Sequence, residues 1–247
     1  MNGLSLHKGV VPYGGTFLIF TDYCRPSMRL SAIMGLKVIY IMTHDSIGLG
    51  EDGTTHQPIE HLLGLRSIPN LYVYRPCDLN ETLECWVDAL VSDQTSIIAL
   101  SRQDLSVLTE PRNINMKNTP EASAKLIFGS QSKRDITIIA SGSEVEIAVA
   151  AAKKMSDNNL KATVISMPCV EKFLEKPTSF RKTILGKAPM MVVEAGLSLG
   201  WRSYFDDLSN AISVESFGAS APKEQLYKHF KITRENIISK ARKIIKR

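Results

Sequence analysis

Short runs of β-branched and other apolar residues alternate with helix-like stretches, and this alternation constrains the fold more than any other feature of the chain. Val38–Thr43, Leu71–Tyr74 and Ser96–Leu100 have the length and composition of buried strands. Between them, Pro58–Ser67 and Asp78–Val91 carry apolar residues near helical spacing. Strands and helices in this order predict a parallel sheet that is covered by helices.

A second α/β series follows a polar stretch that proline interrupts. Residues 111–124 are expected to form a surface linker between a first unit, 1–110, and a second unit, 125–247. Because the first unit has only three expected strands, we expect it to be incomplete at its amino end, so that either a partner chain completes it or the chain is a fragment. The elements expected in the second unit are Ile136–Ala140, Glu144–Met155, Ala162–Ser166, Met190–Glu194, Pro222–His229 and Arg234–Lys246.

The charge balance and the cysteines argue against several classes of function. Lys and Arg outnumber Asp and Glu by 30 to 25, but part of this excess lies at the end of the last expected helix, where cations complement the helix dipole. Aromatic residues are not interleaved with the basic residues there, so no nucleic-acid partner is expected. The 4 cysteines have no metal-ligand spacing, and we expect them to be reduced and mostly buried.

The sequence also lacks the signals of a membrane or secreted protein. No window approaches the roughly 18 consecutive apolar residues of a membrane-spanning helix. Polar residues interrupt the first residues of the chain, which does not match a secretion signal. We therefore expect a soluble, cytoplasmic protein with no membrane partner.

The densest group of reactive side chains follows the first expected strand. Thr43–Pro58 contains two histidines, three carboxylates and three glycines. Loops at the carboxyl ends of parallel strands hold the sites of α/β proteins, and glycines let a ligand approach the backbone closely. Histidines titrate near neutral pH and can move protons. We therefore expect His44, Asp52 and His56 to belong to a functional site, whereas the histidine spacing does not match a helical zinc pair.

Three other segments are weaker candidates. Phe17, Phe20 and Tyr23 recur every three residues, which favours one side of a helix and ordinary core packing over a ligand-binding wall. Arg102 follows the third expected strand, where it either binds an anion or forms a surface ion pair. Ser143 opens a turn before a helix, and a plain helix cap is favoured there over an anion site.

Five segments together resemble transketolase, a thiamine diphosphate enzyme. The resemblance covers essentially the whole chain in order, as the later part of the pyrimidine-binding domain followed by a Rossmann-like C-terminal domain. It implies a homodimer with active sites between subunits, which moves a two-carbon ketol unit from a ketose phosphate to an aldose phosphate in the pentose phosphate pathway. The segments are His44–Pro58, Arg75–Asp78, Ala99–Gln103, Ala140–Val145 and Phe217–Ala221.

The resemblance implies three cofactor-binding residues and one catalytic residue. Phe17, Phe20 and Tyr23 match the aromatic residues that surround the aminopyrimidine ring of thiamine diphosphate, so a cofactor wall replaces the expectation of core packing. His56 matches the histidine beside the cofactor that is proposed to assist proton transfer, and it is the expected catalytic residue.

The resemblance also implies a set of substrate-binding residues. His44 matches a residue that contacts the terminal phosphate of the sugar, and Asp52 matches one that contacts the sugar hydroxyls. Arg102, with Ser101 beside it, matches the anion-binding group for the sugar phosphate. The family assigns no chemistry to the C-terminal domain, so the turn at Ser143 keeps its structural interpretation.

The chain departs from the family in two respects. Thr54 stands where the family loop usually has proline, which removes a rigid turn element but no functional group. The family also has a glutamate shortly before the position of Met1 that hydrogen-bonds the pyrimidine ring, and an earlier domain that binds the diphosphate and Mg²⁺. We therefore expect no metal ligands here and no activity without an amino-terminal transketolase half or a second subunit.

Two other interpretations stay open. The chain could be a non-catalytic remnant, or a dimerisation or regulatory module, although the presence of four residues disfavours long decay: His44, Asp52, His56 and Arg102. It could also belong to another thiamine diphosphate enzyme, such as a 2-oxoacid dehydrogenase β chain or a deoxyxylulose phosphate synthase. Neither of these enzymes is expected to carry the histidine loop in this form.

Overall fold

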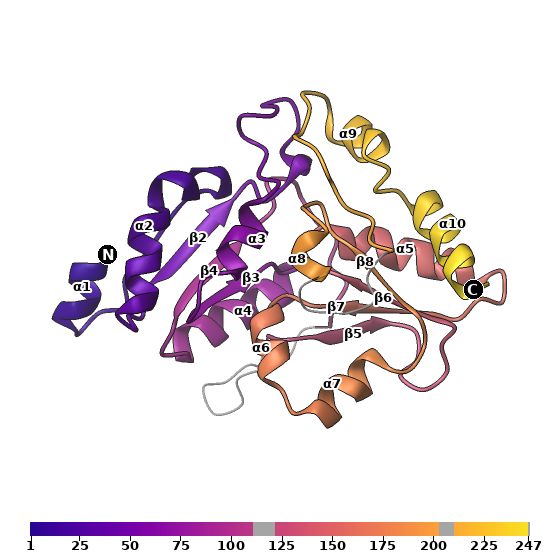
Figure 1. Cartoon of the computed structure of the whole chain (residues 1–247), viewed down its shortest axis with the longest axis horizontal. Coiled ribbons are helices and arrows are strands. Elements are labelled where there is room, and N and C mark those ends of the chain that lie inside the picture. The colour runs from indigo at the N-terminus through magenta and orange to yellow at the C-terminus, as the bar shows by residue number, and fades with distance from the viewer. Residues whose placement is uncertain (111–121, 203–209, 247) are drawn as a thin grey trace.

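The computed structural model describes residues 1–110, 122–202 and 210–246, which form two α/β units (Figure 1). The first unit has a four-stranded parallel sheet in the spatial order β1-β2-β4-β3. Strands β3 and β4 are buried along their whole length, as parallel strands are when helices cover both faces of a sheet. The strands are β1 (Tyr13–Phe17), β2 (Ile39–Thr43), β3 (Leu71–Tyr74) and β4 (Thr95–Ala99).

Helices and short 3₁₀ turns connect the strands of the first unit. Helix α4 begins with a side-chain cap: the Asp78 carboxylate accepts a hydrogen bond from the backbone N–H of Glu81 at 2.8 Å. The helical elements are α1 (Asn2–His7), η1 (Leu18–Phe20), α2 (Thr21–Ile33), η2 (Ile47–Leu49), α3 (His61–Arg66) and α4 (Leu79–Val91).

The second unit has a mixed sheet in the spatial order β5-β7-β6-β8. Strands β6, β7 and β8 are parallel, whereas β5 pairs with β7 in the antiparallel direction. The strands are β5 (Lys125–Phe128), β6 (Ile136–Ala140), β7 (Ala162–Ser166) and β8 (Met190–Val193). The helices are α5 (Glu144–Ser156), α6 (Val170–Glu175), α7 (Thr178–Leu185), α8 (Leu199–Arg202), α9 (Lys223–His229) and α10 (Arg234–Ile245).

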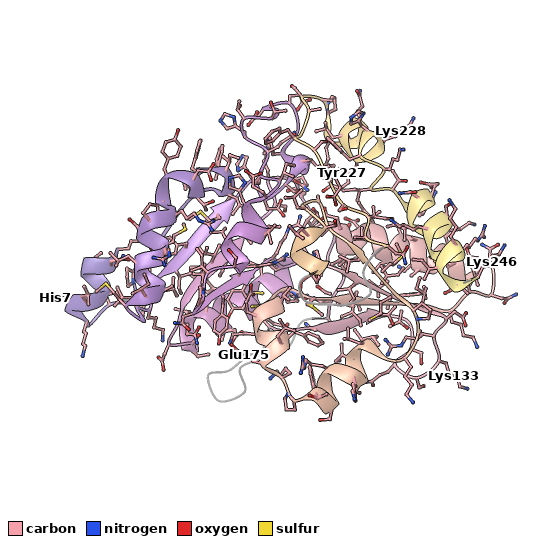
Figure 2. The ribbon with its side chains drawn as sticks, viewed as in Figure 1. His7, Lys133, Glu175, Tyr227, Lys228 and Lys246 are labelled. Atoms are coloured by element: carbon pink, nitrogen blue, oxygen red, sulfur yellow. The ribbon has the colours of Figure 1, made fainter. Side chains whose placement is uncertain are left out.

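Buried polar contacts join the two units. Arg66 at the end of α3 donates two hydrogen bonds to the Glu194 carboxylate, each at 2.9 Å, and both side chains are almost completely buried. Glu175 of α6 accepts a hydrogen bond from the Tyr72 hydroxyl at 3.0 Å, and Figure 2 shows it where α6 lies against the first unit. Because buried charges are costly unless they are paired, these contacts favour one arrangement of the two units.

The structure confirms the alternation of strands and helices and corrects two details of it. The first unit has four strands, whereas the sequence analysis predicted three. The prediction missed β1 because Gly14 and Gly15 remove its apolar alternation. The antiparallel strand β5 was also missed, since Lys125 begins it and its residues are only partly buried. All four cysteines are free thiols, and Cys24 is the one that is not buried.

Two further expectations concern the linker and membrane-spanning helices. Most of the expected linker, residues 111–121, lies outside them. Over residues 1–110, 122–202 and 210–246, no helix is both long enough and apolar enough to cross a membrane.

Candidate active site

Three neighbouring parallel strands end at one edge of the first sheet, and their carboxyl ends bring the candidate site together. Phe17 closes β1 directly opposite Thr43, the last residue of β2. Strand β4 lies on the other side of β2 and leads into Ser101 and Arg102. Ligands of open α/β folds bind at such edges. Phe17, the histidine loop (residues 44–58) and Arg102 therefore meet there although they are far apart in sequence.

Aromatic rings from both sides of this edge pack into one cluster. The rings of Phe17 and His44 are stacked with their centroids 3.5 Å apart. The His56 ring lies edge-on to Phe20, 5.8 Å between centroids, and to Phe17 at 6.4 Å. Tyr23 continues the row, with its ring 6.1 Å from that of Phe20 and with 84% of its surface exposed. The row offers flat apolar surface to a ligand.

The expectation that the three aromatic residues lie along one helix is wrong. Phe17 ends β1, Phe20 ends the 3₁₀ turn η1, and Tyr23 lies in the first turn of α2. The spacing of three residues misled the prediction because a tight 3₁₀ turn also brings every third residue to the same side. The rings are nevertheless neighbours, so the predicted group of side chains is present.

His44 combines an unusual backbone with a perturbed side chain. Its φ angle is +60°, in the left-handed region that non-glycine residues seldom adopt and that often marks functional sites. Partial burial and the positive charge of Arg102 lower the pKa of His44, and the Asp52 carboxylate opposes this effect. His44 is therefore mostly neutral near pH 7, and Arg102 and Asp52 are close enough to act on it.

The remaining predicted residues differ in how open they are. Asp52 and Arg102 are exposed, and His56 is half-buried with Nδ1 2.9 Å from the Thr55 hydroxyl. Ser101 is half-buried, and its hydroxyl donates a hydrogen bond to the backbone carbonyl of Gln103 at 2.8 Å. The structure thus brings His44, His56 and Arg102 to one face, whereas the Ser101 hydroxyl has a partner within its own loop.

A buried charge network beneath the site was not predicted from the sequence. The Arg75 guanidinium donates to the Asp45 carboxylate at 2.8 Å and to the backbone carbonyl of Ser141 at 3.0 Å. It also pairs with Glu144, and the structure leaves all of these side chains almost completely buried. The sequence signal was present, because Asp45, Arg75 and Glu194 each stand one or two positions after a buried strand.

The expectation that Ser143 caps helix α5 is wrong. Ser143 occupies the N-cap position, but its side chain makes no capping hydrogen bond to the helix backbone. Its hydroxyl donates instead to the Glu144 carboxylate at 2.8 Å and lies 3.0 Å from the hydroxyl of Tyr227. Tyr227 of α9, which Figure 2 labels, also donates to Glu144. The buried carboxylate therefore draws the serine away from the helix end.

The site residues suit one part of thiamine diphosphate better than the other. The partly exposed rings of Phe17 and Phe20 and the exposed ring of Tyr23 form a surface on which an aminopyrimidine ring can stack. Within the described ranges, no group of three or more His, Cys, Asp or Glu side chains could hold a metal ion. These residues therefore fit the ring of the cofactor.

Comparison with known proteins places this chain in a family. The family model described as "Transketolase, pyrimidine binding domain" matches residues 1–107, and the one described as "Transketolase-like TK C-terminal domain" matches residues 126–233. A transketolase of Sinorhizobium medicae is 50% identical over 100% of this chain and 36% of that protein. A transketolase of Cereibacter sphaeroides is 49% identical over 99% of this chain and 37% of that protein. The chain thus spans little more than a third of the length of these relatives.

Solved structures agree with the sequence relatives. A transketolase from Leishmania mexicana superposes with a TM-score of 0.89 at 42% identity, over 99% of this chain and 36% of that chain. A structure described as "Split gene transketolase, inactive beta4 tetramer" shares the fold with a TM-score of 0.77 at 21% identity, over 99% of this chain and 79% of that chain. Along this chain, the pyrimidine-binding match comes first and the C-terminal match follows it. The chain therefore belongs to the transketolase family and corresponds to its pyrimidine-binding and C-terminal domains.

Proposed function

We propose that this chain supplies one side of a transketolase active site, at which a two-carbon ketol unit moves from a ketose phosphate to an aldose phosphate. The observation that carries the proposal is the convergence of Phe17, His44 and His56 at one sheet edge. Arg102 and Asp52 lie close enough to His44 to change its pKa. Membership of the transketolase family supports the same reaction.

The aromatic row is the proposed cofactor-binding surface. Phe17, Phe20 and Tyr23 present rings against which the aminopyrimidine ring of thiamine diphosphate stacks, and an apolar wall also excludes water from that ring. When bound, thiamine diphosphate supplies the nucleophilic carbon that cleaves and forms the carbon–carbon bond of the sugar. The role of this chain is to hold and orient the ring.

Polar side chains around the row are the proposed substrate-binding groups. The Arg102 guanidinium is a planar fork that matches the oxygens of a phosphate group. His44, kept mostly neutral near pH 7 by burial and by Arg102, which lower its pKa, donates one hydrogen bond to the same phosphate. Asp52 accepts hydrogen bonds from the sugar hydroxyls, and Ser101 supports the loop on which Arg102 stands.

His56 is the proposed proton-transfer residue. The Thr55 hydroxyl engages its Nδ1 atom at 2.9 Å, which leaves Nε2 to hold or move a proton. The ring lies edge-on to Phe17 and Phe20, so it stands beside the proposed position of the cofactor ring. A histidine in this position can protonate or deprotonate a hydroxyl of the bound sugar.

We infer that polypeptide outside these 247 residues completes the site. The described residues contain no candidate metal cluster, so the ligands for Mg²⁺ and the diphosphate are assigned to an amino-terminal transketolase segment or to a second subunit. The limited share of the relatives that this chain spans supports this assignment. The description of a similar split-gene structure as inactive supports the further proposal that this chain needs a partner for activity.

Mixing the purified chain with a separately made amino-terminal polypeptide tests the proposed function. The amino-terminal part of the Sinorhizobium medicae transketolase is a suitable partner, because that relative is 50% identical to this chain. We expect ketol transfer from the mixture with thiamine diphosphate and Mg²⁺, and none from either polypeptide alone. A mixture that binds thiamine diphosphate but transfers no ketol unit would contradict the proposal.

Two variants of the same mixture test the residue roles. His56→Ala should lower kcat by about 100- to 10,000-fold, the usual contribution of a positioned acid–base group. Arg102→Ala should raise the KM for a phosphorylated aldose by about 10- to 100-fold and leave the KM for its unphosphorylated form unchanged. The matched control is Lys187→Ala, which removes an exposed cation of the second unit and should change neither KM.

A further inference from the structure

We propose that the second unit positions the candidate active site. Residues 217–221, which we call the latch segment, bind Gln57 and thereby hold the histidine loop. Gln57 directly follows His56 and is 2% exposed. The latch segment leads into α9 and lies beside the histidine loop at the top of Figure 1. This inference rests on the proposed function, since it concerns the placement of the proposed proton-transfer residue.

The side chain of Gln57 makes three hydrogen bonds, one within the loop and two to the latch segment. Its Nε2 atom donates to the backbone carbonyl of Gly50 at 3.0 Å and to that of Ala219 at 2.9 Å. Its Oε1 atom accepts a hydrogen bond from the backbone N–H of Ala219 at 2.9 Å. Because a buried amide that loses its partners is costly, Gln57 keeps the end of the loop at a fixed distance from the latch segment.

The latch segment lies too close to the loop for a side chain at position 218. A Cβ atom on Gly218 would overlap Oε1 of Gln57, well inside the 3.0 Å that real Cβ contacts essentially never undercut. Glycine lets the two segments approach this closely. Next to Ala219 in the segment, the hydroxyl of Ser220 donates a hydrogen bond to the backbone carbonyl of Glu51. The latch segment therefore binds the loop at two places.

The other end of the histidine loop is also anchored to the second unit. Asp45, which directly follows His44, is 1% exposed and binds Arg75, which in turn donates to Ser141 of the second unit. Ile47 is completely buried in an apolar cluster formed mainly by residues of the second unit. Each candidate histidine thus stands next to a buried residue that the second unit holds.

This arrangement gives the second unit a part in the proposed reaction without contact to substrate. The His44 and His56 rings are half-buried, so their positions depend on the backbone of the loop as well as on the contacts with Phe17 and Phe20. Displacements of about 1 Å in a reacting group can lower a rate about 100-fold. Gln57 is therefore a positioning residue, and the latch segment is the part of the second unit on which it acts.

Gly218→Ala tests the latch directly, because alanine displaces Gln57 without straining its own backbone. Gly218 does not have the positive φ angle that would exclude alanine. Hydrogen–deuterium exchange on the full chain should become at least about 10-fold faster in residues 45–57 and stay unchanged in β6 (Ile136–Ala140). Ser220→Ala is the milder second variant and should have a smaller effect of the same kind. Ser216→Ala is the matched control, since Ser216 is exposed, directly precedes the latch segment, and its hydroxyl donates to the backbone carbonyl of Phe217 and not to the histidine loop.

The reconstituted enzyme then tests whether the latch matters for the reaction. Gly218→Ala should lower kcat per bound thiamine diphosphate by about 10-fold or more, which a smaller fraction of folded protein would not do. Unchanged exchange in residues 45–57, or faster exchange with unchanged kcat, would overturn the inference. If the wild-type mixture has no activity, the proposed function fails, and the exchange measurement still decides whether the latch segment holds the loop.

Discussion

The carboxyl edges of the two sheets differ in solvent exposure. At the carboxyl edge of the first sheet, Arg102 is exposed and His44 is half-buried. At the carboxyl edge of the second sheet, Ser141 and Glu144 are completely buried and Glu194 is 2% exposed. Both edges are of the kind that binds ligands in α/β folds. Of the two, the first edge is the one that is open to a ligand.

The difference arises because one unit covers the edge of the other. Arg66 and Arg75 of the first unit insert their guanidinium groups among the carboxylates of the second edge. Those carboxylates could bind a cationic or hydroxyl-bearing ligand if they were open, but here protein groups satisfy them. The same architecture therefore yields an open edge that carries the candidate site and a buried edge that anchors one unit to the other.

The largest effect should follow from removing the cation between the two edges. Arg75→Met leaves the buried carboxylates of Asp45 and Glu144 without their cation. Breaking a buried pair in this way should lower the free energy of unfolding by about 3–5 kcal/mol, measured by denaturant titration. Lys37→Met breaks an ion pair with the fully exposed Asp93, and its effect should stay below about 1 kcal/mol. Equal losses in the two variants would show that the second edge is not an anchoring surface.

A smaller decrease in the free energy of unfolding is expected at acidic pH. Its source is a carboxylate of the buried edge and not of the open edge. Burial alone would raise the pKa of Glu194, but the adjacent Arg66 guanidinium lowers it to about 2. A carboxylate with a lowered folded pKa contributes stability that is complete above its unfolded pKa and is lost as the pH falls through its folded pKa.

The test compares the wild type with Glu194→Gln as a function of pH. The difference between their free energies of unfolding should be constant above 4.5, the ordinary pKa of a glutamate side chain, and shrink as the pH approaches 2. A decrease of about 1–3 kcal/mol is expected over this window. Glu224→Gln, which removes an exposed carboxylate, should show no comparable change. A difference that does not depend on pH would contradict the assignment of Glu194 as an ionised anchor.

The smallest effect concerns the open edge. Arg102→Met removes a positive charge that lowers the pKa of His44, so the pKa of His44 should rise, as measured by NMR titration of the imidazole. Lys187→Met removes a cation of the second unit and should leave the titration of His44 unchanged. No upward shift in the Arg102 variant would mean that the two side chains are not neighbours in solution.

Local patterns predicted most of the strands and helices, but they missed strand β1 and the turn that follows it. The buried apolar run of β6 and the helical spacing of α5 were recognised because each signal lies within one element. Strand β1 was missed because two glycines dilute its pattern. The aromatic row was found as a set of residues, but its backbone was predicted wrongly, since a spacing of three residues fits a helix and a tight turn equally well.

The sequence by itself determined that this chain has two α/β units and that a loop with two histidines follows a buried strand, because periodicity and residue chemistry are local properties. Only the tertiary structure decided which side chains of that loop are open and which are buried. His56 and Gln57 are neighbours in sequence, yet Gln57 is buried because Ala219 meets it from the other unit. Contacts between residues so far apart in the chain depend on how the two units pack, which no local pattern records.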